Sequence, residues 1–425
     1  MNEFDKIFGY ESEKQEMLRL CDVLCNRKKY ESLGITLPKA VLFYGEPGLG
    51  KTLMAKAFIE ATDRKVFQCK KNKSNGEFVD EIKSTFENAI KDAPSIIFFD
   101  DMDKFAEDNL QQDCNKEEFV AIQTGLEDIV DKDVFVIATA NDINNLPESL
   151  LRVGRFGKKL QFSAPSLDDS VKIIRHYLAS KKVSSDVKPE SLAHILHGHS
   201  CAMLENVINE AGIYAAYNNA PEITIDHIRE AVSTVMIERI PLSENDTTKP
   251  MIAYHEAGHA VMHLLARHDV GCLAIGKCGK DGLGVGICTL AKPEKLASYE
   301  EMHNFILMLL SGKAGSELQF GTTDTGVEKD VKEAMSLIQD NLQLSLLHGF
   351  EYCYTTYRFD ESQSYGQLDK NQEKAVRLLE EYYHEAKSLL LKHKELLDAI
   401  ANELLEKEIL IYDDIIRIVE RYSFD

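Results

Sequence analysis

The first third of the chain alternates short apolar runs with longer amphipathic stretches. The runs AVLFYG (40–45), SIIFFDD (95–101) and VFVIATAN (134–141) are largely apolar and end in glycine or polar residues. Continuous apolar runs of this length indicate strands that are buried on both faces, and the helical spacing between them indicates helices that cover a sheet. We therefore predict an α/β domain with a parallel sheet over residues 1–162.

The rest of the chain has mainly helical spacing. Three amphipathic segments within 163–238 predict a small helical subdomain, and the last begins at Thr224, a favourable N-cap. The stretch RIPLSENDTTKP (239–250) contains two prolines and a polar centre, which predicts a linker. Beyond it, 251–425 is mostly helical, and the glycine-rich segment 272–290 predicts one hairpin or small sheet.

Composition narrows the class of protein. A chain of 425 residues predicts two or three domains, and a net charge of -21 predicts no nucleic-acid partner, because phosphate backbones would repel it. The 9 cysteines include no C-x-x-C pair and follow no signal sequence, which favours reduced intracellular thiols. No apolar run approaches the roughly 18 residues that cross a bilayer. We therefore expect a soluble, cytoplasmic chain with no membrane span.

The segment GEPGLGKT (45–52) matches the phosphate-binding pattern G-x-x-x-x-G-K-[ST] and stands between a predicted strand and a predicted helix. In such a loop the backbone N–H groups face the phosphates, the lysine reaches the β and γ oxygens, and the threonine hydroxyl binds Mg²⁺. The segment therefore predicts a site for ATP and Mg²⁺. The residues assigned to this site are Gly45, Pro47, Gly48, Gly50, Lys51 and Thr52.

Polar residues follow the other two predicted strands. Asp100 ends the second strand, where it would hold Mg²⁺, and Asp101 would orient the attacking water. Asn141 ends the third strand, where its amide could sense the γ-phosphate. Arg152 and Arg155 lie in LLRVGRF. Arginines near an ATP site often neutralise transition-state charge, although two such arginines taken alone are more often solvated surface charges.

A second pattern, His255-Glu256-x-x-His259, occurs in MIAYHEAGHAVMHLLARH (251–268), which has helical apolar spacing. On a helix the two histidines lie on one face, about a turn apart, where they can hold one zinc ion. Glu256 between them can take a proton from a water. The pattern arises by accident in about a few per cent of chains this long. A zinc site of this kind needs a third protein ligand, which the pattern itself does not supply.

In order, the segments IFGYE, GEPGLGKT, FFDD, TAND, LLRVGRF and NVINEA resemble the AAA module of the FtsH family of ATP-dependent zinc metalloproteases. The resemblance covers nearly the whole chain. It implies an α/β P-loop AAA ATPase core with a small helical lid, then a mostly α-helical zinc metallopeptidase domain, assembled as a hexameric homo-oligomer. It also implies that adenine lies near Ile7 and Gly9, and that Arg152 and Arg155 act on the ATP of a neighbouring subunit.

The segment LLSGKAGSELQFGTTDTGVEKDVKEA (309–334) resembles the family's stretch that ends at a metal-binding aspartate. On that match Asp330 is the third zinc ligand and Glu317 is a partner of one histidine. Without the resemblance, a carboxylate at a helix start is more often a cap. The segment GLGVGIC (282–288) resembles the edge strand beside which these enzymes bind an extended polypeptide, by backbone hydrogen bonds that confer little sequence preference.

The chain departs from the family pattern in several places. The two membrane helices that usually precede the ATPase have no counterpart, so the chain is either a natural soluble form or part of a longer protein. Asp101 stands where the family has glutamate, and losing one methylene withdraws the carboxylate by about 1.5 Å, which predicts slow hydrolysis. In CKKNKSNGEFVDE (69–81), polar residues replace the aromatic loop that grips substrate, and Phe78 is the nearest aromatic residue. Gly157 replaces an acidic residue after GRF.

The sequence thus predicts an ATP-dependent zinc metalloendopeptidase that degrades unfolded or tagged polypeptides. Glu256 is the predicted general base, and Zn²⁺, ATP and Mg²⁺ are the predicted cofactors. One alternative is an ATP-dependent remodeller or chaperone with an idle peptidase, against which the intact zinc motif argues. Another is a peptidase that uses ATP mainly to assemble its ring, which Asp101 and the altered segment 69–81 favour.

Overall fold

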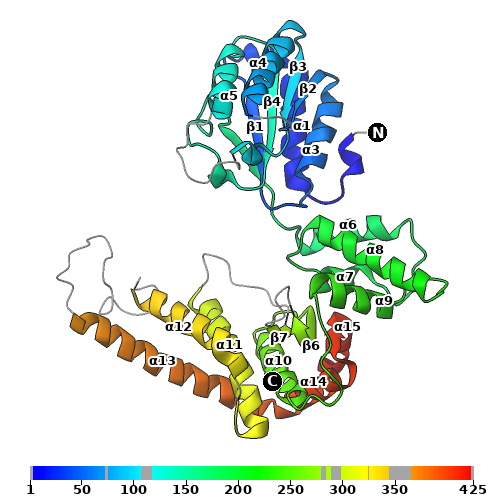
Figure 1. The fold of residues 1–425 in the computed structure, drawn as a ribbon, viewed down its shortest axis with the longest axis vertical. Coiled ribbons are helices and arrows are strands. Elements are labelled where there is room, and N and C mark those ends of the chain that lie inside the picture. Colours follow the sequence, from blue (N-terminus) through cyan, green and yellow to red (C-terminus); the bar gives the residue numbers. More distant parts are fainter. Residues whose placement is uncertain are drawn as a thin grey trace. The chain divides into compact units, whose positions relative to one another are not determined.

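The computed structural model divides the chain into two compact units, which are described separately below (Figure 1). The first unit comprises Met1–Ala179 and Gly198–Glu205, and the second comprises Ser180–His197 and Asn206–Asp425. The residues that the structure describes are 3–71, 75–106, 117–278, 284–288, 298–323, 325–343 and 365–422.

A parallel five-stranded sheet forms the centre of the first unit. Its strand order is β2-β3-β4-β1-β5. The bounds are β1 Ala40–Tyr44, β2 Lys65–Cys69, β3 Ser95–Phe99, β4 Val134–Ala140 and β5 Lys158–Gln161. The three predicted strands are the three inner ones, β1, β3 and β4, which are buried almost throughout. The edge strands β2 and β5 were not predicted, because their exposed positions interrupt the apolar pattern.

Helices cover both faces of this sheet, as the spacing predicts. In Figure 1, α1 and α3 lie on one face, and α4 and α5 lie on the other. The α bounds are α1 Glu11–Cys25, α2 Arg27–Glu31, α3 Lys51–Thr62, α4 Asn75–Lys91, α5 Glu117–Asp128 and α6 Leu167–Leu178. The short 3-10 turns are η1 Glu3–Lys6, η2 Met102–Ala106 and η3 Ile143–Asn145. Buried phenylalanines of α4, α5 and η2 pack against β3 and β4, so the core is continuous with the carboxyl end of the sheet.

The second unit is mostly helical. Its elements are α7 Pro189–Ile195, most of α8 Cys201–Tyr217, α9 Ile225–Ala231, the π-helical turn η4 Val232–Met236, α10 Lys249–Leu265, α11 Tyr299–Phe320, η5 Thr325–Val327, α12 Glu328–Gln343, α13 Tyr365–Lys392, α14 Lys394–Lys407 and α15 Tyr412–Val419. Strands β6 Cys272–Cys278, β7 Gly284–Cys288 and β8 Ile409–Ile411 form an antiparallel sheet in the order β7-β6-β8, which confirms the predicted small sheet. Among the described helices, none is long and apolar enough to cross a membrane.

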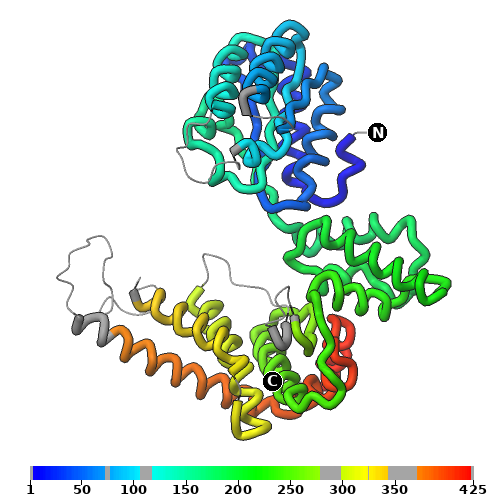
Figure 2. The backbone as a smooth tube through the Cα atoms, in the orientation of Figure 1, coloured from blue at the N-terminus to red at the C-terminus, as the bar shows by residue number. Residues whose placement is uncertain are grey.

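A bundle of α10, α11, α13 and α14 forms the core of the second unit, and the long α13 packs along α11 and α12 (Figure 2). A capping box of Ser298 and Glu301 begins α11, and Gly321 ends it in the left-handed conformation that glycine adopts readily.

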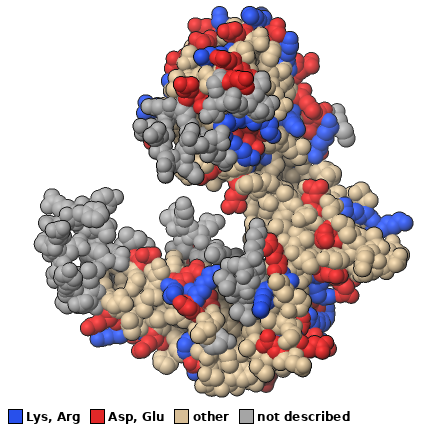
Figure 3. Space-filling view, in the orientation of Figure 1, with Lys and Arg blue, Asp and Glu red and all other residues tan. Residues whose placement is uncertain are grey.

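On the face that Figure 3 shows, acidic and basic side chains are interspersed over both units.

Candidate nucleotide and metal sites

The phosphate-binding loop connects β1 to α3 and depends on its glycines. Gly45, Gly48 and Gly50 all have positive φ, at 142°, 80° and 87°, which other residues adopt at a cost. A Cβ on Gly45 would also lie 2.0 Å from the carbonyl oxygen of Phe162, so no other residue fits there. The loop leads directly into α3, and the N–H groups at the start of that helix have no helical partners and favour anions.

Lys51 is the centre of this loop. Its side chain is buried, and its Nζ donates to the carbonyl oxygens of Gly45 at 2.7 Å and Glu46 at 2.8 Å, and to Oδ1 of Asn141 at 2.9 Å. Burial lowers the pKa of Lys51, against the opposing effect of the nearby carboxylates. The structure thus brings Asn141, at the end of β4, next to the lysine of the loop after β1, because β1 and β4 are neighbours in the sheet.

Asp100 lies beside the same loop, at the end of β3. Its Oδ1 accepts hydrogen bonds from the hydroxyls of Thr52 at 3.0 Å and Thr139 at 2.9 Å, and its Oδ2 lies 3.4 Å from Nζ of Lys70. A threonine hydroxyl next to a buried carboxylate is an oxygen-ligand arrangement that suits Mg²⁺. Sequence reasoning did not assign Thr139 or Lys70 to this site. The polar Thr139 inside an apolar strand was the available signal for the first.

Asp101 has a backbone conformation that is unusual for aspartate, with φ at 55°. Its N–H donates to the Thr139 hydroxyl at 2.9 Å, and its Oδ2 accepts from Nζ of Lys104 at 2.9 Å. Thr139 therefore links the two acidic residues. The carboxylate of Asp101 is held by a lysine three residues along the chain.

The other residues predicted to act on the nucleotide are Arg152, Arg155, Ile7 and Gly9, and the contacts described for them do not involve the phosphate-binding loop. Arg155 donates to the carbonyl oxygen of Ser149 and to Glu127, both at 2.7 Å, and Arg152 is exposed. Their action on a neighbouring subunit stays a prediction. Ile7 is buried, and Gly9 has a φ of 71° with Asp169 of α6 so close that a Cβ would lie 2.9 Å from it. The adenine position near Ile7 and Gly9 also stays a prediction.

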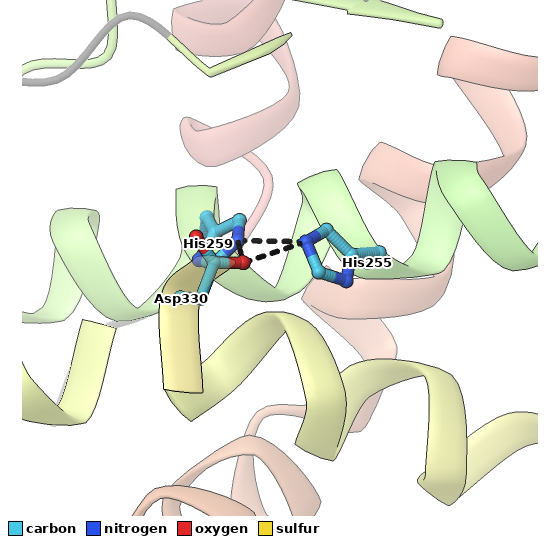
Figure 4. Close-up of side chains that lie close together, drawn as sticks. All are labelled: His255, His259 and Asp330. Carbon is cyan, nitrogen blue, oxygen red and sulfur yellow. Dashed lines mark hydrogen bonds and ion pairs between the residues drawn. The ribbon is translucent and has the colours of Figure 1, made fainter. Parts of the chain in front are cut away.

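The second candidate site lies between α10 and α12 (Figure 4). The Nε2 atoms of His255 and His259 are 3.0 Å apart, and Oδ2 of Asp330 lies 3.2 Å from the first and 3.4 Å from the second. These three residues form a group of ligand atoms that could hold a metal ion. Hydrogen bonds from the two histidines hold the pKa of Asp330 well below its usual range, although burial opposes this effect.

A backbone carbonyl of α11 orients the ring of His259. Its Nδ1 lies 2.8 Å from the carbonyl oxygen of Met308 in α11, which can only accept, so Nδ1 carries a proton. When the ring is neutral, Nε2 is then the nitrogen with the lone pair. The hydroxyl of Ser311 donates to the same carbonyl at 2.5 Å. This is the tautomer that a metal ligand requires. Sequence reasoning did not identify Met308 or Ser311.

Glycines leave the space in front of the two histidines. A Cβ on Gly312 of α11 would lie 2.6 Å from Nε2 of His259 and 2.7 Å from Nε2 of His255. Gly258 and Gly315 let α10 and α11 approach so closely that a Cβ on either would meet the other helix's backbone at 2.3 Å and 2.5 Å. The donor set of two imidazoles and one carboxylate fits zinc, which also needs the room that Gly312 leaves.

Glu256 lies on α10 between the two histidines and is 6% exposed. Burial raises the pKa of its carboxyl group, while the two histidines lower it and Asp330 raises it further. A raised pKa is what a general base needs to exchange protons near neutral pH.

Glu317 is not a partner of either histidine, so this interpretation was wrong. Within the ranges that the structure describes, its carboxylate accepts hydrogen bonds from Lys313 at 2.6 Å, from Lys387 at 2.9 Å and from the hydroxyl of Tyr383. These bonds lower the pKa of Glu317 to about 2, against the opposing effect of burial. Glu317 therefore ties α11 to α13.

The segment 69–81, predicted to replace the substrate-gripping loop, is described only in part, since 72–74 lie outside the described residues. The first two residues of the predicted edge strand 282–288 also lie outside them. Phe78 is fully buried and packs edge-on against Phe105, so it belongs to the core of the first unit. Lys71 donates to the carbonyl oxygen of Phe105 at 3.1 Å. Strand β7 is at an edge of the small sheet, beside α10.

Two family models match the chain. The ATPase family associated with various cellular activities (AAA) matches residues 41–164, which include the phosphate-binding loop, and peptidase family M41 matches residues 243–418, which include the two histidines and Asp330.

Three relatives, each named ATP-dependent zinc metalloprotease FtsH, align with almost the whole chain. The protein from Streptobacillus moniliformis is 31% identical over 95% of this chain and 62% of its own length. The protein from Aster yellows witches'-broom phytoplasma is 32% identical over 98% of this chain and 64% of its own length. FtsH 2 from a Thermoanaerobacter species is 30% identical over 95% of this chain and 80% of its own length. The chain thus spans less than two thirds of the first two relatives.

Proposed function

Because the chain belongs to the FtsH family of ATP-dependent zinc metalloproteases, we propose that it is an ATP-dependent zinc metalloendopeptidase that degrades unfolded or tagged polypeptides. The proposal includes a homo-oligomeric ring, a hexamer, and Mg²⁺ bound with ATP at Thr52 and Asp100. The observation that carries it is the convergence of His255, His259 and Asp330 on one point, next to a buried glutamate.

His255, His259 and Asp330 would hold zinc, which when bound supplies a Lewis acid that polarises a water and the scissile carbonyl. Met308 keeps His259 in the tautomer that presents Nε2 to the ion. Glu256 accepts the proton of the attacking water and later gives it to the leaving amine. The buried position of Glu256 excludes bulk water from this proton transfer.

In the nucleotide site, Lys51 would exchange the carbonyl oxygens of its own loop for phosphate oxygens. Asn141 holds that ammonium in place from β4, and Asp101 would orient the attacking water. Arg152 and Arg155 would complete the site of the next subunit.

The test is degradation of a permanently unfolded fluorescent protein by the zinc-loaded protein with ATP. Glu256→Gln should lower the cleavage rate by a factor of about 10² to 10⁴ while leaving bound zinc and ATP hydrolysis unchanged. Equal rates for the two proteins would refute the proposed mechanism. Lys51→Ala is the matched variant for the other site, and it should abolish ATP binding but leave zinc bound.

A second candidate function is a peptidase that needs ATP mainly to assemble its ring. Two observations favour it, namely the burial of Phe78 in the core and the engagement of Asp101 by Lys104. Degradation with a non-hydrolysable ATP analogue separates the two functions. Cleavage with ATP alone indicates threading by the motor, and equal cleavage with the analogue indicates that nucleotide only assembles the ring.

A further inference from the structure

Two helices of the predicted lid contact α15, the last helix of the peptidase part, within the second unit. The Ser191 hydroxyl of α7 donates to Oδ1 of Asp413 at 2.8 Å. The ring of His194 stacks on the ring of Tyr412, with centroids 4.1 Å apart and planes at 3°. Nδ1 of His194 also lies 3.1 Å from Oδ2 of Asp269, so α7 is held at both of its ends.

The second contact is an ion cluster around one buried carboxylate. The side chain of Asp414 is 2% exposed, and its Oδ2 accepts from Arg229 of α9 at 3.0 Å, while its Oδ1 accepts from Lys407 at 2.9 Å. These partners hold the pKa of Asp414 below its ordinary value, although burial opposes this. Removal of Arg229 would leave a buried carboxylate with less compensation, so the cluster resists separation of α9 from α15.

The segment predicted as a linker is also attached at its start. Ile240 and Lys277 of β6 exchange backbone hydrogen bonds of 2.7 Å and 3.0 Å. Arg239 donates to the carbonyl oxygen of Ile275 at 2.6 Å and pairs with Glu408. A free hinge leaves its backbone unpaired, and here the first residues of the segment 239–250 are paired with the sheet.

We propose that these contacts form a latch that joins α7 and α9 to the peptidase domain as one rigid body, so that nucleotide-driven motion arises within the AAA module and not at the segment 239–250. The inference rests on the proposed function. Helix α8 contacts the phosphate-binding loop: its first turn belongs to the first unit, where the Ala202 N–H donates to the carbonyl oxygen of Gly48 at 3.1 Å. The rest of α8 belongs to the second unit.

The latch can be tested by covalent closure. In the full chain, Ser191→Cys and Asp413→Cys are combined and joined with a short bis-thiol reagent, and each single variant treated with the same reagent controls for the native cysteines. The latch predicts equal cross-link yield without nucleotide, with ADP and with ATP, and no loss of ATP-dependent degradation after joining. A yield that changes with nucleotide overturns it. The proposal is also overturned if the cross-linked protein loses ATP-dependent degradation but still cleaves a short peptide.

A second variant opens the latch instead. Arg229→Met keeps the apolar stem but removes the charge that faces Asp414. It should lower ATP-dependent degradation on the order of tenfold, as expected of a residue in a coupling element, with ATP hydrolysis and short-peptide cleavage unchanged. Unchanged degradation argues against the latch. If the unmodified protein cleaves no peptide, the proposed function fails, but the cross-link yields in the three nucleotide states still decide whether the latch exists.

Discussion

Gly312 determines whether zinc can occupy its site, and Gly312→Ala should remove the metal. A methyl group at this position would lie 2.6 Å from Nε2 of His259 and 2.7 Å from Nε2 of His255. Zinc binds imidazole nitrogen at about 2.0–2.1 Å, so a methyl carbon this close to both nitrogens would crowd an ion held by them. The methyl group and the zinc ion fit together only if the two imidazole rings move apart, and that movement would break the hydrogen bond between His259 and the carbonyl oxygen of Met308.

The displacement of the histidines sets the expected loss of zinc affinity. Losing the oriented position of even one histidine should weaken zinc binding by about 10- to 100-fold, as loss of an orienting partner does. The cost in folding is separate. An added methyl in a close helix crossing destabilises by about 1–3 kcal/mol. The expected result is therefore a folded protein with a lower Tm, far weaker zinc binding and no zinc-dependent rise in Tm.

Gly315→Ala is the matched control, because it lies on the same helix and its Cβ would meet the backbone oxygen of Tyr254 at 2.5 Å without reaching the histidines. It should lower Tm to a similar extent but keep zinc. The assay is chelator competition for zinc, with thermal unfolding of each protein with and without the metal. Retention of zinc by Gly312→Ala at the affinity of the unmodified protein would refute the reasoning.

Three further outcomes are expected. Lys70→Met should lower the half-saturating Mg²⁺ concentration for nucleotide binding by up to about fivefold, because the lysine of the Lys70–Asp100 pair is exposed and such a pair is worth at most about 1 kcal/mol, whereas Lys70→Arg should leave that concentration unchanged. Asp101→Glu should raise the rate of ATP hydrolysis on the order of tenfold with unchanged ATP affinity, since it restores the missing methylene; a slower variant would contradict this. The pKa of Glu317 is lowered from 4.5 to about 2, so its stabilising effect is full above the ordinary value and is lost as pH falls toward 2. Denaturant unfolding should show that loss as about 1–2 kcal/mol, after allowance for solvent screening, and Glu317→Gln should not show it.

The inner strands and the two chemical motifs could be predicted because each is a local pattern. β1, β3 and β4 are buried on both faces, so their apolar runs are continuous, whereas β2 and β5 lie at the edges and carry exposed positions. Phe78 shows the limit of such reasoning. Its apolar side chain is equally compatible with a substrate-gripping loop and with a core, and only the packing against Phe105 distinguishes them.

Glu317 shows a second limit. The family resemblance implied a histidine partner, but Lys387 and Tyr383 come from α13, and no spacing along the chain reveals that helix as a neighbour. The predicted linker shows the same limit. Its prolines and polar residues indicate an irregular segment, but they do not reveal that Ile240 pairs with Lys277 of β6.

The sequence by itself determined which groups can do chemistry. The spacing of His255 and His259 places both on one face of any helix, and the loop pattern around Lys51 turns backbone N–H groups toward an anion wherever it is placed. Tertiary structure decided which of these groups meet. Only the packing of α10, α11 and α12 brings Asp330 to the histidines and leaves the place of a side chain on Gly312 empty, because contacts between distant segments depend on the whole core and not on local spacing.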